Sequence, residues 1–192
     1  MKILLIDNFD SFTYMLRDYL MQAGATCMVI RNDVLSVNAV EEIKPDAIVI
    51  SPGPGKPADA GKLMAVLPFL VEHYPVLGVC LGHQAIGAFF GAELGPATLP
   101  KHGKVETIYC LNTQLFDGMN EFCATRYHSL ILTNLGVELE LLAWTASKEV
   151  MAIKHKSLPI WGIQFHPESC LTKVGMQIIH NFLKEVKTLA TV

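Results

Sequence analysis

The first half of the chain alternates between short apolar runs and longer segments of helical periodicity, and this rhythm constrains the fold more than any other feature. Runs rich in Val, Ile and Leu are typical of strands buried on both faces. Strands are predicted at residues 2–7, 26–31, 47–51 and 76–80, and helices at residues 11–24, 37–44, 60–73 and 83–94. Such alternation predicts an α/β fold with a parallel, doubly wound sheet.

The second half changes character, because short alternating segments there lie between turn residues. They are predicted as antiparallel strands added to the sheet, at residues 104–110, 127–133, 139–145, 149–155 and 160–165. Residues 173–187 have the spacing of an amphipathic helix that closes one face of the sheet. No repeat or linker-like segment interrupts the chain, so a single domain spanning residues 1–192 is expected, with an open, mostly parallel sheet.

Composition excludes several classes of protein. A net charge of -3 leaves no basic footprint of the kind that nucleic-acid partners require. No apolar stretch approaches the roughly 20 residues of a membrane span, and the opening "MKILLID" is too short for a signal peptide. A cytoplasmic location without a membrane partner is therefore expected. The 5 cysteines are odd in number and lack CxxC spacing, which predicts free thiols rather than disulfides.

Four polar or glycine-rich segments follow predicted strand ends. They are "DNFDS", "SPGPGKP", "CLGHQ" and "HPES". Open α/β sheets bind ligands beyond the carboxyl ends of their strands. The topology therefore predicts that these four segments converge on one edge of the sheet.

The segment "VLGVCLGHQ" places Cys80 between Gly78 and Gly82, where a buried strand passes into a helix. The G-x-C-x-G pattern is that of a nucleophile elbow, a sharp turn that needs glycines because larger residues would collide. A helix N-terminus also favours the thiolate, the reactive form of cysteine. Taken alone, the segment fits a buried cysteine beside a glycine-rich turn equally well.

His166, Pro167 and Glu168 follow the last predicted strand. Residues two apart in an extended chain point to the same side, and Pro167 biases His166 towards extended geometry. Glu168 can then accept the second ring N–H of His166, which is the orienting role of the third member of a catalytic triad. The alternative is a solvated His/Glu pair in a surface turn.

The loop "SPGPG" could complete an oxyanion site. An elbow enzyme uses the N–H of the residue after its nucleophile, here Leu81, and a second N–H from a neighbouring loop. Gly53 or Gly55 could supply that second donor, with Pro54 holding the loop rigid. The alternative is an ordinary connecting turn.

Metal binding is a competing hypothesis for the same residues. Cys80, His83, His166 and Glu168 include a plausible Cys-x-x-His ligand pair. A structural zinc site usually draws on two such knuckles, and this chain has no second one, so no metal is expected.

A phosphorylated receiver domain is a further alternative, because Asp7 and Asp10 follow the first predicted strand and could hold Mg²⁺. The third predicted strand, however, ends in "SPGPG" rather than in an acceptor aspartate. This alternative is weaker than that of a thiol enzyme.

The motifs together are far more specific than any one of them. With "GVCLGHQ", "SPGPG", "YHSL" and "QFHPES", the chain resembles the class I glutamine amidotransferases, which implies a flavodoxin-like fold. The segment "DNFDSFT" is similar to that of the glutaminase subunits of anthranilate synthase and aminodeoxychorismate synthase. The resemblance extends from Lys2 to about Leu183.

This resemblance implies hydrolysis of L-glutamine to glutamate and ammonia through a glutamyl thioester. Cys80 would attack the side-chain amide, His166 would transfer the protons, and Glu168 would orient His166. Leu81 and the "SPGPG" loop would hold the oxyanion. A separate chorismate-binding synthase subunit would use the ammonia.

The resemblance also implies where the substrate is held and what the partner contributes. Gln84 and the backbone of Ser129 and Leu130 would grip the amino-acid end of glutamine. No cofactor is implied for this chain, because the Mg-dependent chemistry is expected on the synthase subunit.

Alternatives and departures from the family pattern stay open. Another cysteine hydrolase, such as a γ-glutamyl hydrolase, and a non-catalytic scaffold are the competing functions, although the complete Cys/His/Glu set argues against the scaffold. Met15, Lys101 and Cys170 replace the Asn, Met and Ile that are common in the family at these positions. The segments "TRYHSL" and "EVMAIKH" slightly favour the aminodeoxychorismate type over the anthranilate type.

Overall fold

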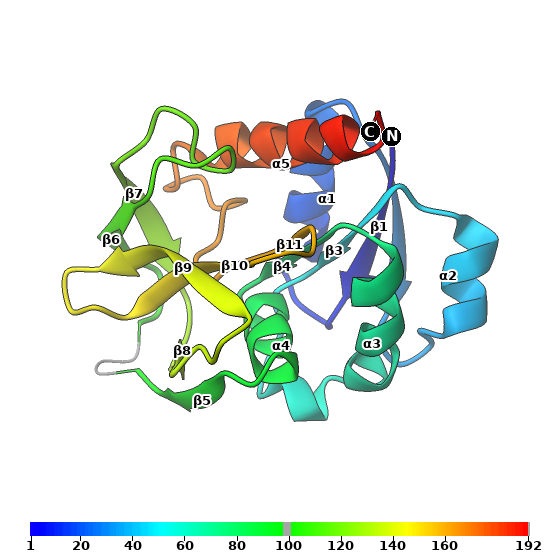
Figure 1. Ribbon diagram of the computed structural model, residues 1–192, viewed down its shortest axis with the longest axis horizontal. Helices are drawn as coiled ribbons and strands as arrows, with labels where there is room; N and C mark the ends of the chain where they lie inside the picture. The colour runs from blue at the N-terminus through cyan, green and yellow to red at the C-terminus, as the bar shows by residue number, and fades with distance from the viewer. Residues whose placement is uncertain (98–100, 192) are drawn as a thin grey trace.

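A nine-stranded sheet with the order β2-β1-β3-β4-β11-β10-β9-β6-β7 forms the centre of the computed structural model, which describes residues 1–97 and 101–191 (Figure 1). Its strands are β1 (Lys2–Asp7), β2 (Thr26–Arg31), β3 (Ala47–Ile50), β4 (Val76–Val79), β6 (Lys104–Cys110), β7 (Glu121–Arg126), β9 (Leu139–Thr145), β10 (Val150–His155) and β11 (Ile160–Ile163). The helices are α1 (Thr13–Gln22), α2 (Val37–Ile43), α3 (Leu63–His73), α4 (Leu81–Phe89) and α5 (Gly175–Leu189), with a 3₁₀ turn at Pro57–Asp59. A separate pair joins β5 (Glu93–Pro96) to β8 (Leu130–Thr133).

The strands from β2 to β11 in this order run parallel, as predicted. Every residue of β3 and β4 is buried, because helices cover both faces of the sheet. Helices α1 and α5 pack on one face, and α2, α3 and α4 lie on the other (Figure 1). The carboxyl ends of β1, β3, β4 and β11 therefore meet at one edge of the sheet. The expected mostly parallel, doubly wound α/β fold with added antiparallel strands is confirmed.

Strand β11 corrects one prediction. It was expected among the antiparallel strands, but Ile160 lies opposite Val76 in a parallel register with β4. The turn between β10 and β11 reverses the chain, so β11 is antiparallel to β10 and runs in the direction of β4. The N–H of Cys80 donates to the carbonyl of Ile163 (2.8 Å), which ties the ends of the two strands together.

Two further boundaries differ from the prediction. The helix expected at residues 83–94 ends at Phe89, because Gly91 adopts a left-handed conformation (φ 83°) that terminates helices. The strand expected at residues 127–133 begins only at Leu130, as β8, and it pairs with β5 in a separate sheet instead of joining the main one. Strand β7 was missed because its buried apolar positions end at Arg126, and a charged residue conceals the pattern of a buried strand.

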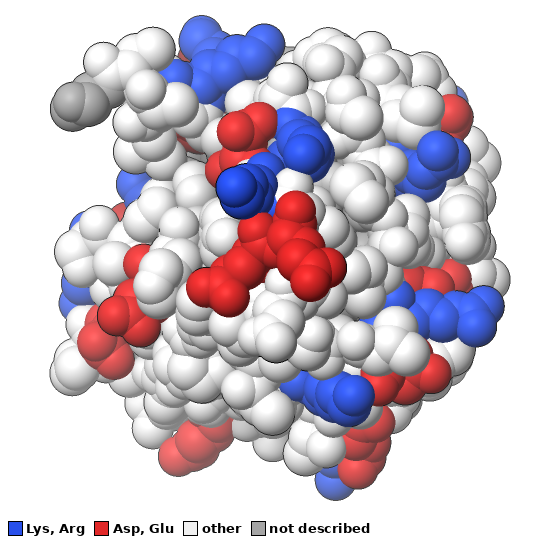
Figure 2. All heavy atoms as spheres, turned by 90° about the vertical axis from the view of Figure 1, so that its right-hand side faces the viewer, with Lys and Arg blue, Asp and Glu red and all other residues white. Residues whose placement is uncertain are grey.

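On the side that faces right in Figure 1, acidic and basic side chains lie beside one another (Figure 2). Within the described ranges, none of the helices has both the length and the apolar character needed to cross a membrane.

Candidate active site

Cys80 occupies the bend between β4 and α4, with a backbone φ of 52° and ψ of -100°. A non-glycine residue in such a conformation is strained by about 1–3 kcal/mol. The flanking glycines have no space for a side chain. A Cβ on Gly78 would lie 2.4 Å from the carbonyl carbon of Gly82, and a Cβ on Gly82 would lie 2.5 Å from the carbonyl oxygen of Ile50. The structure thus contains the sharp strand–turn–helix that G-x-C-x-G predicted.

Two neighbouring loops are fastened to each other beside this bend. The N–H of Asn8 donates to Ser51 Oγ (2.9 Å), and Asn8 Nδ2 donates to the carbonyl of Ser51 (2.9 Å). Asn32 Nδ2 donates in turn to Asn8 Oδ1 (3.0 Å). Gly53 is enclosed, because a Cβ there would lie 2.6 Å from Asn8 Cβ and 2.8 Å from the side chain of Leu81. The "SPGPG" loop is therefore held against the first residue of α4.

His166 and Glu168 form a buried pair in which His166 Nδ1 lies 2.6 Å from Glu168 Oε1. The two side chains share one side of the chain, as the His-Pro-Glu spacing predicted. The N–H of His166 donates to the carbonyl of Thr125 (3.1 Å), so β7 anchors this loop. Among the described residues, His166 Nε2 has no hydrogen-bond partner. The ring is oriented through Nδ1 by Glu168.

The surroundings of His166 favour its charged form. Burial alone would lower its pKa, but interactions with Cys80 and Glu168 outweigh burial and raise the pKa to about 10. The rings of Phe12 and Tyr127 meet the imidazole edge-on, with centroids 5.5 Å and 5.1 Å away. An imidazolium held beside a thiol is the arrangement that activates a cysteine nucleophile.

A cavity of about 190 Å³ opens onto Cys80. Its other lining residues are Gly53, Pro54, Gly55, Gln84, His102, Tyr127, His128, Ser129 and Leu130. Every predicted substrate contact except Leu81 is among them. The volume lies below the range typical of drug-sized ligands and suits a small metabolite.

Gln164 is a residue that the sequence analysis missed. Its Nε2 lies 3.6 Å from Cys80 Sγ, and its Oε1 accepts a hydrogen bond from Gln84 Nε2 (3.1 Å). Gln84 Nε2 also donates to the carbonyl of Leu130 (3.1 Å), so this amide pair joins α4 to β8. The available signal was the spacing, because Gln164 lies two residues before His166 and shares its side of an extended chain.

A buried charged cluster was also missed. Arg126 is completely buried, and its guanidinium binds Glu106, Glu149 and the ring of His128. Glu106 forms a second ion pair with Lys101 (3.6 Å), one of the residues that depart from the family pattern. No sequence signal marked this cluster, because charged residues are expected at the surface.

The other departing residues lie outside the cavity. The side chain of Met15 on α1 is exposed, and Cys170 is an exposed free thiol in the loop after Glu168. Neither contributes to the lining around Cys80.

The alternative sites have little support in this geometry. Over the residues that the structure describes, no group of three His, Cys, Asp or Glu side chains could hold a metal ion. His83 packs against β11, where a Cβ on Gly162 would lie 2.7 Å from its Nδ1, and burial lowers the pKa of His83 to about 3. Asp7 Oδ1 accepts a hydrogen bond from the hydroxyl of Thr13 (2.8 Å), which anchors the start of α1.

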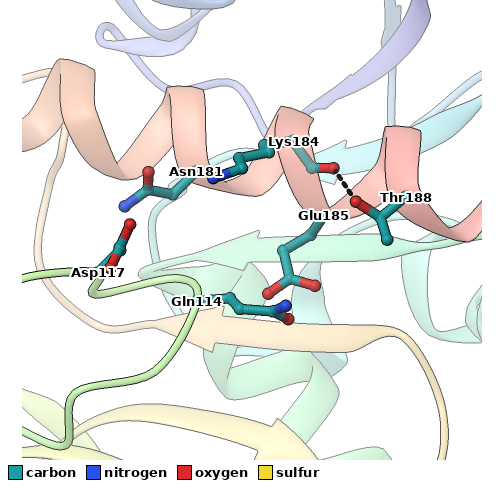
Figure 3. Close-up of a pocket in the computed structure, with 6 residues that line it drawn as sticks. All are labelled: Gln114, Asp117, Asn181, Lys184, Glu185 and Thr188. Carbon is teal, nitrogen blue, oxygen red and sulfur yellow. Dashed lines mark hydrogen bonds between the residues drawn. The ribbon is translucent and has the colours of Figure 1, made fainter.

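A second hollow lies between α5 and the loop after β6, and it is lined by Gln114, Asp117, Asn181, Lys184, Glu185 and Thr188 (Figure 3). Its volume is only about 50 Å³. Polar groups here bond within the protein: Asn181 Nδ2 donates to the carbonyl of Leu115 (3.0 Å), and the Thr188 hydroxyl donates to that of Lys184 (3.0 Å). None of the residues predicted for the active site lines this hollow.

Comparison with known proteins decides the family. The profile described as "Glutamine amidotransferase class-I" matches residues 4–186. The chain belongs to the class-I glutamine amidotransferases. Among relatives of this amidotransferase, anthranilate synthase component 2 of Thermus thermophilus is 46% identical over 189 residues, covering 96% of this chain and 93% of that protein. Aminodeoxychorismate/anthranilate synthase component 2 of Bacillus subtilis is 43% identical over 185 residues, covering 95% of each.

Solved structures agree with the fold of this amidotransferase. A putative GMP synthase component of Thermoplasma acidophilum superimposes with a TM-score of 0.89 at 27% identity, covering 100% of this chain and 96% of that one. A glutamine amidotransferase of Thermotoga maritima gives a TM-score of 0.76 at 12% identity, covering 98% and 97% of the two chains, and supports the fold alone.

Proposed function

We propose that this chain is a glutaminase subunit, which hydrolyses L-glutamine to glutamate and ammonia and supplies the ammonia to a chorismate-binding synthase subunit. The observation that carries the proposal is Cys80 at a strained bend, facing a cavity and interacting with the buried His166–Glu168 pair. Membership of the glutamine amidotransferase family supports the choice of substrate.

In the proposed reaction, the thiol proton of Cys80 first passes to His166 Nε2, which forms the imidazolium, and Sγ then attacks the side-chain amide carbon of glutamine as the thiolate. The resulting oxyanion lies near the N–H of Leu81, which as the first residue of α4 has no intrahelical acceptor. Gly53 or Gly55 provides the second donor. The C–N bond then breaks, and His166 returns the proton to the departing ammonia, which leaves a glutamyl thioester on Cys80.

The second half of the cycle uses the same groups in reverse. His166 takes a proton from water, the hydroxide attacks the thioester carbon, and the C–S bond breaks to release glutamate while His166 returns its proton to Cys80 Sγ. Glu168 stabilises the imidazolium in both halves, because it accepts the Nδ1–H bond and carries the opposite charge.

The amino-acid end of glutamine is proposed to lie at the part of the cavity formed by Gln84, Ser129 and Leu130. Backbone groups at Ser129 and Leu130 and the Gln84 amide can bond the α-amino and α-carboxylate groups. Pro54 and the neighbouring glycines, which also line the cavity, are proposed to lie around the side-chain amide.

The partner is proposed from the relatives, which are named as second components of anthranilate synthase and of aminodeoxychorismate synthase. One relative carries both names, so one such subunit serving two synthases is the simplest proposal. Mg-dependent chemistry on chorismate is assigned to the partner.

The test combines the purified chain with each synthase subunit, chorismate, Mg²⁺ and either glutamine or ammonium. Cys80→Ser should abolish formation of aromatic product from glutamine and leave formation from ammonium unchanged. The identity of the aromatic product assigns the synthase. Normal glutamine turnover by Cys80→Ser would refute the assignment of the nucleophile.

A further inference from the structure

Arg126 is completely buried at the end of β7, yet it neither lines the cavity nor touches Cys80 or His166. Its guanidinium binds the carboxylates of Glu106 on β6 and Glu149 beside β10. A buried ion cluster of this kind is weak evidence for stability, because apolar residues of similar size often serve as well. The residues that bind Arg126 and its partners therefore indicate which other role Arg126 has.

One connection runs through His128. Arg126 Nε donates to His128 Nε2 (3.0 Å), so the proton of the neutral imidazole must sit on Nδ1. Nδ1 then donates to the carbonyl of Leu130 (2.9 Å). Burial and the charge of Arg126 lower the pKa of His128 to about 3, which keeps this tautomer neutral. The same carbonyl accepts from Gln84 Nε2.

A second connection runs through Glu106. This carboxylate also pairs with Lys101 Nζ (3.6 Å), and the N–H of Lys101 donates to the carbonyl of His128 (3.1 Å). The next residue, His102, lines the cavity. Two separate segments of the cavity rim, residues 101–102 and 128–130, are thus fastened to partners of one guanidinium.

We propose that Arg126 is a positioning residue that sets the selectivity of this site for the amino-acid end of glutamine. By fixing the His128 ring and through it the Leu130 carbonyl, it aims the Ser129–Leu130 backbone and the Gln84 amide into the cavity. Loss of this control weakens the hold on the α-amino and α-carboxylate groups without changing the reactivity of Cys80. The inference rests on the proposed glutaminase function.

The test compares two reagents that alkylate Cys80 in the purified chain with its synthase subunit present. One is a chloromethyl ketone analogue of L-glutamine, in which the side-chain amide nitrogen is replaced by CH₂Cl. The other is iodoacetamide, which lacks an amino-acid end. In both reactions Sγ forms a C–S bond, halide leaves, and the thiol proton is taken up by His166 or water.

Arg126→Lys is the main variant, since lysine keeps the charge but cannot present the planar fork to two carboxylates and an imidazole. The half-saturating concentration of the analogue should rise roughly tenfold or more, with its limiting rate and the iodoacetamide rate within about threefold of wild type. Arg31→Lys, at an exposed arginine that pairs with Asp7, is the matched control and should change neither reagent's kinetics.

The outcomes separate the inference from the function on which it rests. If Arg126→Lys saturates with the analogue as wild type does, or loses both reactions equally, Arg126 does not position the amino-acid end. If wild type itself shows no saturation with the analogue, the proposed function fails, and the inference fails with it. If Arg126→Lys does not unfold cooperatively, Glu106→Gln is tested in its place. The half-saturating concentration of the analogue should then rise about threefold, and no rise would contradict the inference.

Discussion

The two halves of the sheet build their parts of the site by different means. In the parallel half, aliphatic strands are buried on both faces, and Cys80 is presented by backbone geometry at a bend that only glycines allow. In the antiparallel half, β6, β7 and the start of β10 enclose a buried arginine with two carboxylates, and hydrogen bonds shape the cavity wall. Steric exclusion places Cys80, and buried polar bonding shapes the wall of the cavity.

The largest expected effect comes from adding one methyl group to the parallel half. In Gly78→Ala the Cβ would lie 2.4 Å from the backbone of Gly82 at the bend that carries Cys80. We expect loss of measurable glutamine hydrolysis and a fall in the free energy of unfolding of about 3 kcal/mol or more. Urea unfolding and an ammonia assay check both quantities.

The matched control is Gly95→Ala in β5, where the nearest atom to the added Cβ is 3.8 Å away. Its free energy of unfolding should change by less than about 1 kcal/mol, with hydrolysis retained. Comparable losses in both variants would mean that steric exclusion at the bend is not what places Cys80.

The second-largest effect is expected at Glu168. Glu168→Gln keeps the size of the side chain but removes the charge and the fixed acceptor that orients His166. We expect kcat for glutamine hydrolysis to fall about 10³–10⁴-fold with little change in KM. Glu138→Gln, at an exposed glutamate paired with His155, is the control and should retain full kcat. A fall below tenfold for Glu168→Gln would remove Glu168 from the triad.

The two halves also differ in how much of their structure could be predicted from the amino-acid sequence. Apolar runs at β1, β3 and β4 could be assigned as parallel strands because both faces are buried, and that assignment placed the loops of Cys80 and Ser51 at one edge. The His166–Glu168 pair followed from a local rule, the two-residue spacing of extended chain. That these loops form one site followed from the principle that open α/β sheets bind ligands beyond the carboxyl ends of their strands.

The antiparallel half resisted prediction because its determinants are non-local. The direction of β11 depends on a turn after β10, and a strand's sequence does not encode its partner. Arg126 belongs to a buried strand only because Glu106 and Glu149, distant in sequence, neutralise it. The spacing to His166 could have placed Gln164 on the same side of the chain, but its contacts with Cys80 and Gln84 depend on the fold.

Two buried histidines near the cavity, His166 and His128, should contribute to the free energy of unfolding with opposite pH dependence. His166 has its pKa raised from 6.5 to about 10, so its contribution to the free energy of unfolding is complete below pH 6.5 and is lost as pH rises towards 10. His128 has its pKa lowered from 6.5 to about 3, so its contribution is present above pH 6.5 and is lost as pH falls towards 3.

Denaturant unfolding at a series of pH values between about 4 and about 8.5 measures how the free energy of unfolding changes with pH on each side of pH 6.5. His166→Gln should flatten the decline above pH 6.5, and His128→Gln should flatten the decline below it. Curves for both variants that run parallel to wild type over the whole window would contradict the opposite protonation of the two rings.

The smallest expected effect lies at the joint between the halves. The Thr172 hydroxyl, in the loop after Glu168, accepts the N–H of Thr125 on β7 (3.0 Å), next to the backbone bond from His166 to Thr125. Thr172→Val preserves the shape but leaves a buried N–H without its acceptor, which should reduce the free energy of unfolding by about 1–3 kcal/mol. Because only one of the two tethers is lost, kcat should fall by no more than about tenfold.

The control is Thr188→Val, which removes an exposed hydroxyl bond on α5 and should change the free energy of unfolding by less than about 0.5 kcal/mol. Equal unfolding free energies for the two variants would show that β7 does not depend on this hydroxyl to hold the loop of His166 and Glu168.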